Sequence, residues 1–245
     1  MSNSKSSENI SQATIDELIN LYNENKLSET ISLGTSLTRQ FPNAQILYEV
    51  TGAANLGLEL FEEAIKSYQK LLQLNPKHID AYNNLGMAFY EQCNFSDAAE
   101  NYQKAVNIEP SFADAHYNLG NALKRMGDLR KAIESYRMCL AINPNDVEVL
   151  SEYGGALKDH GNLEKACECY GQVLKIRPDD AHANWQKGSI LVKLNKAQNS
   201  LPYFEKAVAE NPKETVYWLS FIKTLFQLGN HKLAMDVINR SENTG

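Results

Sequence analysis

Apolar residues recur along this chain every three or four positions, in pairs of short segments separated by polar breaks. Residues at this spacing share one side of a helix, so each segment predicts an amphipathic helix. Within residues 79–112, the apolar side of the first segment comprises Tyr82, Leu85, Gly86 and Phe89. The apolar side of the second comprises Ala98, Ala99, Tyr102, Ala105 and Val106. The two segments predict a pair of antiparallel helices joined by a short turn.

The helix pair recurs with a period of 34 residues. Each pair ends in a proline, namely Pro42, Pro76, Pro110, Pro144, Pro178 and Pro212. In phase with them run Gly52, Gly86, Gly120, Gly154 and Gly188, and then Tyr68, Tyr102, Tyr136, Tyr170 and Phe204. A fixed period predicts a stack of like units that pack mainly against their neighbours. We expect the glycines to allow close approach of two helices, and the aromatic rings to fill the space between one pair and the next.

The prolines divide the chain into seven repeats, which begin at residues 11, 45, 79, 113, 147, 181 and 215. Residues 1–10 are rich in Ser and Asn and are expected to be a disordered tail, and residues 241–245 a short polar tail. Residues 11–240 are expected to form one all-α solenoid of about seven antiparallel helix-turn-helix units.

The sixth repeat departs from the pattern at two places. Pro202 falls inside the expected second helix. Proline is harmless only at the start of a helix, so we predict that this helix begins at residues 199–201. Asn184 and Lys187 stand where apolar residues are usual, next to Trp185. Trp185 either covers the resulting gap or faces a ligand, and the pattern leaves both interpretations open.

Composition narrows the function classes. The net charge is −6 and the isoelectric point about 5.5, which disfavours a nucleic-acid partner or an anionic membrane surface. No apolar run reaches the length of a membrane span, and residues 1–9 do not resemble a secretory signal. We therefore expect a cytoplasmic protein with four reduced cysteines. The sequence contains no phosphate-binding glycine loop and no His-Glu-x-x-His motif, so we expect no enzyme activity, cofactor or metal.

The repeated residues resemble the tetratricopeptide repeat (TPR), whose pattern is aromatic-x-x-Leu-Gly-x-x-Tyr, then Ala-x-x-x-Phe, then Pro. The repeats at 79–112 and 113–146 match it best, and the resemblance covers about residues 11–240. It implies a right-handed superhelix whose first helices line a concave groove. It also implies a protein-interaction scaffold that binds an extended peptide or partner segment in that groove.

The resemblance also implies which positions of the first helices face the groove. The candidate partner-binding residues are Asn83, Met87, Tyr90, Tyr117, Asn118, Asn121, Lys124, Arg125, Lys158, Trp185 and Lys193. Amides suit capture of a peptide backbone, and aromatic rings suit anchoring of side chains. The lysines favour a partner segment with some acidic character.

Two alternatives stay open at this point. Similar repeats precede sulfotransferase, glycosyltransferase or oxygenase domains in bacterial proteins, so the chain could be the targeting or substrate-recognition region of a larger enzyme. The apolar residues Trp218, Phe221 and Phe226 of the last repeat also allow self-association through that end.

Overall fold

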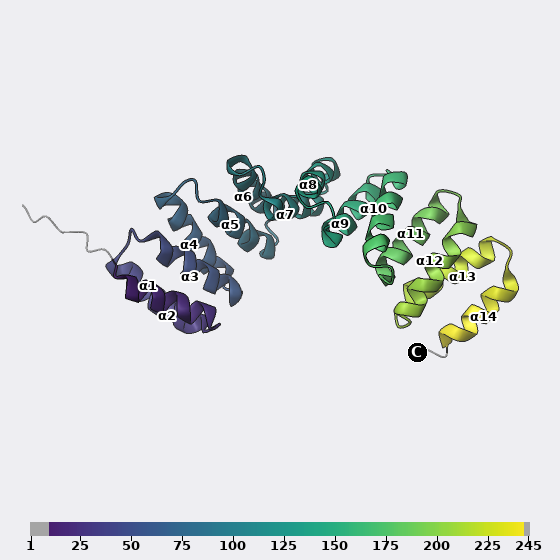
Figure 1. Ribbon diagram of the computed structural model, residues 1–245, viewed down its shortest axis with the longest axis horizontal. Helices are drawn as coiled ribbons and strands as arrows, with labels where there is room; N and C mark the ends of the chain where they lie inside the picture. Colours follow the sequence, from purple (N-terminus) through teal and green to yellow (C-terminus); the bar gives the residue numbers. More distant parts are fainter. Residues whose placement is uncertain (1–9, 243–245) are drawn as a thin grey trace, which may run out of the picture. The chain divides into compact units, whose positions relative to one another are not determined.

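The computed structural model describes residues 10–242, which form 14 helices and no strand (Figure 1). The first three pairs are α1 Gln12–Asn23 with α2 Leu27–Gln40, α3 Gln45–Gly57 with α4 Phe61–Leu74, and α5 Ile79–Glu91 with α6 Phe95–Ile108. The next two are α7 Ala113–Arg125 with α8 Leu129–Ile142, and α9 Val147–Asp159 with α10 Leu163–Ile176. The last two are α11 Ala181–Lys193 with α12 Ala197–Glu210, and α13 Thr215–Gln227 with α14 His231–Glu242. The predicted all-α solenoid of seven helix pairs is confirmed.

The predicted tails lie outside the described residues except at their inner ends. Ile10 packs against a cluster that contains Leu18, Leu37 and Leu47, and α14 continues to Glu242. The described chain divides into two compact parts, an N-terminal half of residues 10–126 and a C-terminal half of residues 127–242. Each half is described separately below.

First helices pack beside one another. In the N-terminal half α1, α3, α5 and α7 lie side by side in this order, and in the C-terminal half α11 lies beside α13. Within each half, second helices such as α4, α6, α10 and α12 pack against the first helices before and after them in the chain. The first helices therefore form a layer of their own, and we call its surface the first-helix face.

The recurring glycine and the recurring aromatic residue pack against each other within one repeat. A Cβ atom on Gly86 would lie 2.7 Å from the Tyr102 ring. The corresponding distances are 2.9 Å for Gly52 and Tyr68, 3.0 Å for Gly154 and Tyr170, and 2.8 Å for Gly188 and Phe204. As expected, the aromatic residue also packs against the following pair, where the Phe204 and Phe221 rings lie 6.3 Å apart between centres. Within its own pair, the ring occupies the place of the side chain that glycine lacks. A methyl group there would overlap the ring.

The first repeat reverses this arrangement. Leu18 stands at the glycine position and Gly34 at the aromatic position. Leu18 is fully buried, and one of its methyl groups lies 3.6 Å from the Cβ position of Gly34. A large side chain and a missing one have exchanged places, so the contact between the two helices is preserved.

The fourth residue of most repeats bonds the proline six residues before it. Each of these side chains donates a hydrogen bond to a proline carbonyl oxygen. The pairs are Tyr48 with Pro42 at 3.0 Å, Tyr82 with Pro76 at 3.3 Å, His116 with Pro110 at 2.9 Å, Asn184 with Pro178 at 3.1 Å and Trp218 with Pro212 at 2.8 Å. The remaining residue at this position is Leu150, whose side chain has no donor. The polar residue Asn184 therefore has a structural role at this position, because it makes the hydrogen bond that Tyr48 and Tyr82 make in other repeats.

Every turn between paired helices contains one left-handed residue. Three are glycines, Gly127, Gly161 and Gly229, with φ of 82°, 90° and 72°. Four are not, and Asn25, Glu59, Cys93 and Asn195 have φ between 58° and 59°. This conformation is costly for residues other than glycine and, to a lesser extent, asparagine.

The predicted start of the helix that contains Pro202 is wrong. Helix α12 begins at Ala197, so Pro202 is its sixth residue and lies beyond the first turn. Proline cannot donate to the Gln198 carbonyl oxygen four residues earlier. Both Pro202 and Gln198 are exposed, so water can solvate that oxygen. An exposed position thus tolerates a proline that a buried one would not.

Among residues 10–242, no helix combines the length and apolar character that a membrane crossing requires.

Candidate partner-binding surface

In the N-terminal half, the candidate residues lie on α5 and α7, which are neighbours on the first-helix face. Asn118 of α7 donates from its side-chain nitrogen to the Asn83 oxygen of α5 at 3.0 Å. Asn83 is only 7% exposed, and its own nitrogen lies 3.7 Å from the Met87 sulfur atom. The bond uses one of the two amide hydrogens of Asn118. The two amides are thereby held in one orientation, 35 positions apart in the sequence.

Arg125, at the end of α7, is held by aromatic rings. Its guanidinium carbon lies 4.4 Å from the centre of the Phe95 ring and 5.9 Å from that of Tyr90. The two rings meet edge to face, with centres 5.2 Å apart. Stacking uses the face of the guanidinium group and leaves its N–H edges able to bind a carboxylate. Phe95 was missed from the sequence, although Phe61 at the same place in the preceding repeat was a signal for it.

The other α7 candidates, Tyr117, Asn121 and Lys124, are half-buried, and Met87 on α5 is exposed. The N-terminal half therefore brings together eight of the eleven predicted residues on two adjacent helices.

In the C-terminal half, Lys158 begins a chain of hydrogen bonds that joins α9 to α11. Its ammonium group donates to the Gln186 oxygen at 3.1 Å, and the Gln186 nitrogen lies 3.1 Å from His182 Nε2. Lysine can only donate, so the Gln186 oxygen must face it and the Gln186 nitrogen must face the histidine. His182 Nε2 then accepts, and the proton of the neutral ring lies on Nδ1. Lost solvation of the ring lowers the pKa of His182, and Lys158 adds to this while Asp180 opposes it.

Trp185 connects α11 to α13. Its indole nitrogen donates to the Ser220 hydroxyl at 2.9 Å, and its ring lies 5.6 Å from both Tyr217 and His182 between centres. It also packs against the buried cluster of the last two repeats. The indole N–H is committed within the chain, so a partner could contact only the ring. Lys193, the last candidate, is exposed on α11.

Two of the contributors in this half, Gln186 and His182, were not among the predicted site residues. They lie 28 and 24 positions from Lys158, so only folding brings them to it. The signal that could have found Gln186 is its place in the repeat, which is the place of Asn118 two repeats earlier.

Residues 10–242 hold no group of three or more His, Cys, Asp and Glu side chains placed to bind a metal. The four cysteines are free thiols, and burial raises the pKa of Cys169 to about 11.

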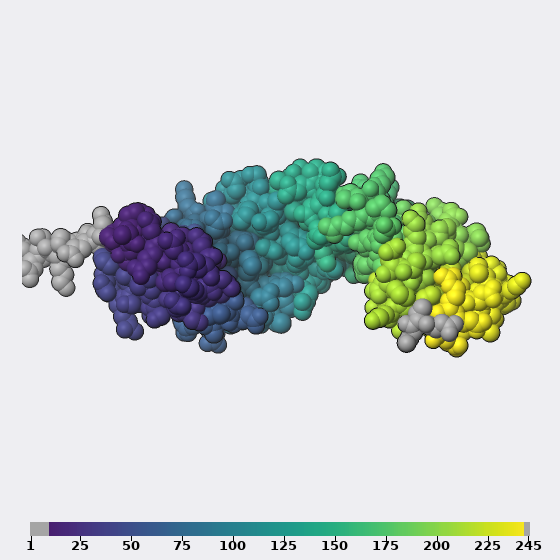
Figure 2. All heavy atoms as spheres, turned by 60° about the horizontal axis from the view of Figure 1, so that its bottom comes forward, coloured from purple at the N-terminus to yellow at the C-terminus, as the bar shows by residue number. Residues whose placement is uncertain are grey.

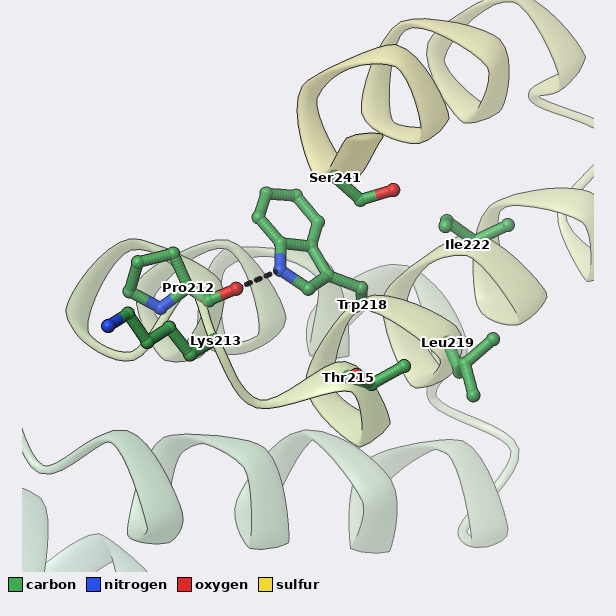
Figure 3. Close-up of a pocket in the computed structure, with 7 residues that line it drawn as sticks. All are labelled: Pro212, Lys213, Thr215, Trp218, Leu219, Ile222 and Ser241. Carbon is green, nitrogen blue, oxygen red and sulfur yellow. Dashed lines mark hydrogen bonds between the residues drawn. The ribbon is translucent and has the colours of Figure 1, made fainter. Parts of the chain in front are cut away.

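The last repeat carries a separate hollow of about 420 Å³. It is lined by Trp218, Leu219, Ile222 and Ser241, among others, and Figure 3 shows the Trp218 ring between the Pro212 turn and the end of α14. None of the predicted groove residues lines it.

Known proteins similar to this chain share its architecture. Comparison with curated proteins gave no match. Among solved structures, MamA is 24% identical, with 71% of this chain and 94% of MamA covered and a TM-score of 0.66. YrrB, described as a TPR protein with an unusual peptide-binding site, is 21% identical over 75% of this chain and 95% of its own, with a TM-score of 0.69. The C-terminal part of a TPR repeat-containing protein from Cytophaga hutchinsonii is 18% identical over 93% of both chains, with a TM-score of 0.78.

Three family profiles match most of the chain. The profile described as TPR repeat matches residues 60–93 and 88–127, and two described as tetratricopeptide repeat match residues 113–146 and 154–215. Together with the seven helix pairs, these matches show that the chain belongs to the tetratricopeptide repeat family.

Proposed function

We propose that this protein is a non-catalytic interaction scaffold, and that the first-helix face of its N-terminal half binds an extended segment of another protein. The observation that carries the proposal is the Asn118–Asn83 hydrogen bond between α5 and α7. Asn118 is half-buried, and because Asn83 fixes its amide, its carbonyl oxygen and second amide hydrogen can pair with the N–H and C=O groups of a peptide backbone laid along the face. The orientation of this amide is set before the partner arrives, which lowers the entropic cost of binding.

Arg125 specifies what kind of segment binds best. Its guanidinium group rests on Phe95 and Tyr90 and is exposed to solvent. A planar guanidinium group binds a carboxylate through two parallel hydrogen bonds. A partner with an Asp or Glu near the bound backbone therefore fits this half, in line with the expected acidic character.

The first-helix face of the C-terminal half offers a second, separate set of contacts. His182 presents its Nδ1 hydrogen as a donor, and Lys158 and Lys193 add positive charge. A partner would bind there through its carbonyl or carboxylate oxygens. We expect a protein partner, not a nucleic acid, because the net charge is −6. A cytoplasmic location, with the exposed Cys93 thiol reduced, is part of the same proposal.

Selection from a library of random linear peptides, followed by fluorescence anisotropy, tests the proposal. Removal of a backbone hydrogen bond costs about 1–1.5 kcal/mol, so Asn83→Ala and Asn118→Ala should each weaken the selected peptides about tenfold. Arg125→Ala should weaken the acidic peptides most.

Matched controls lie on second helices of the same half. Gln103→Ala removes an exposed amide of α6, and Arg39→Ala removes an exposed guanidinium group of α2. Both should leave binding unchanged. If peptides bind the three first-helix variants as tightly as the wild type, and circular dichroism shows these variants folded, the first-helix face is not the binding surface.

A further inference from the structure

The two ends of the repeat array differ in polarity. In the inner repeats, two positions of each second helix pack against the next first helix. These are Ile65 and Leu72 of α4 against α5, Ile133 and Leu140 of α8 against α9, and Leu201 and Val208 of α12 against α13. The equivalent residues of α14 are Met235 and Glu242. No helix among the described residues covers them, and Met235 is 52% exposed.

The uncovered side of α14 forms one stripe. It consists of His231, Met235, Ile238 and Glu242, at spacings of three and four residues. We call it the terminal stripe. Beside it, Leu219 of α13 is 60% exposed, whereas its counterpart Trp185 is covered by Tyr217 of the following helix. Leu219 and Ile222 line the hollow that reaches Ser241, next to the stripe (Figure 3). The last repeat thus exposes the surface that other repeats bury.

The N-terminal end does not offer a matching apolar surface. Glu17 of α1 stands where inner first helices carry Leu85 or Leu119, and Asn20 stands where they carry Ala88 or Ala122. Figure 2 shows the surface of α1 and α2, in purple, with no other helix over it. Stacking α1 of one copy on α14 of another would bury the Glu17 carboxylate against apolar groups, which is unfavourable. Head-to-tail association into open filaments is therefore disfavoured.

The terminal stripe is instead complementary to itself. If two copies of α14 pair in antiparallel orientation about the point between Asp236 and Val237, Met235 of each copy faces Ile238 of the other. His231 and the adjacent Lys232 then face Glu242. The twofold rotation that brings the apolar residues together also brings the Lys232 and Glu242 charges together. The surface is thus complementary to itself, as a closed twofold interface requires. We propose that the terminal stripe is the interface of a twofold dimer of this chain, formed by antiparallel α14 helices.

The size of the surface predicts a weak dimer. A helix of 12 residues spans about 18 Å, so α14 with Leu219 and Ile222 buries on the order of 500 Å² per copy. Stable interfaces bury ~800 Å² per partner, so we expect a dissociation constant on the order of 10–100 µM.

Sedimentation velocity of the full chain across about 5–500 µM tests the proposal. The wild type should shift from monomer to dimer, and no larger species should form. Met235→Lys should raise the dissociation constant at least about tenfold. The matched control is Met126→Lys, which changes a methionine that is 49% exposed but lies in the N-terminal half, and it should dimerise as the wild type does.

A charge exchange tests the antiparallel orientation. Glu242→Lys and Lys232→Glu should each weaken the dimer several-fold, and the double variant should restore it. All these positions are exposed, and circular dichroism confirms that each variant folds. A wild type that stays monomeric throughout, a dimer that survives Met235→Lys, higher oligomers, or a double variant as weak as the single ones would each overturn the proposal.

Discussion

The left-handed residue in the third turn makes a measurable prediction. Cys93 has a φ of 59°, and it lies in the cap that ends α5. Its N–H donates to the Tyr90 carbonyl oxygen at 2.8 Å, and the N–H of Asn94 donates to that of Phe89 at 2.9 Å. Glycine is the usual residue at this place, and other residues lose about 1–2 kcal/mol in this conformation. We predict that Cys93→Gly stabilises the protein.

The magnitude follows from two opposing terms. Relief of the backbone strain contributes about 1–2 kcal/mol, while the greater freedom of glycine in the unfolded chain takes back about 0.5–1 kcal/mol. The Cys93 side chain is exposed, so its loss removes little packing. A net gain of about 0.5–1 kcal/mol should remain, which raises the melting temperature by ~1–4 °C for a chain of this size.

Urea denaturation, monitored by circular dichroism at 222 nm, measures the change in the free energy of unfolding. The comparison holds if the slope of this free energy against urea concentration is the same in both proteins. Cys93→Ala is the matched control, because it removes the thiol and keeps the Cβ atom. Gly161→Ala is the reverse test, since φ is 90° there and a Cβ atom would meet nothing within 4 Å. It should destabilise by about 1–2 kcal/mol through the backbone alone. A Cys93→Gly protein no more stable than Cys93→Ala would refute the reasoning.

Three further predictions concern packing, hydrogen bonding and pH. Gly86→Ala should cost about 1–3 kcal/mol in denaturant melts, because the new methyl group overlaps the Tyr102 ring; a neutral result would contradict the seating of the ring on the glycine. Asn184→Ala should cost about 1–3 kcal/mol, since its buried amide bonds the Pro178 and Asp180 carbonyl oxygens at 3.1 and 3.0 Å, and an unchanged stability would show that these bonds matter little. The His182 pKa is lowered by lost solvation, so the unfolded chain binds more protons and stability should fall as the pH drops below 6.5. The part of this stability loss that His182 causes should be absent in His182→Ala, and thermal unfolding measured above and below pH 6.5 tests this.

Much of the fold could be predicted because its signals are local. Helix α5 runs from Ile79 to Glu91, as the apolar spacing from Tyr82 to Phe89 predicts. The second helices from α2 to α12 each end two residues before a proline, because that residue cannot continue a helix. Pro202 was misjudged because tolerance of a helical proline depends on whether the carbonyl oxygen it leaves unpaired reaches water. That exposure is a property of the packed structure.

The candidate site was predicted less completely. The place of Asn83 and Asn118 in the repeat was visible, but the bond between them joins residues 35 positions apart. Phe95 escaped notice because it belongs to another helix than Arg125, which it contacts, and Gln186 because it belongs to another helix than Lys158, from which it accepts. A repeat pattern states which side of a helix a residue occupies, and it does not state which neighbour that residue meets.

The period of 34 residues and the placement of glycine, aromatic residue and proline were sufficient to establish seven stacked helix pairs, since helix formation and repeat stacking follow from local pattern. Folding was required to show that in four repeats the ring rests on the glycine of its own pair, and that Asn184 and His116 make the hydrogen bond of tyrosine at the proline turns. It was also required to show that Glu59 and Cys93 adopt a backbone shape suited to glycine. These features arise from contacts between helices and from the geometry of the turns, where the energy of the whole stack outweighs the preference of a single residue.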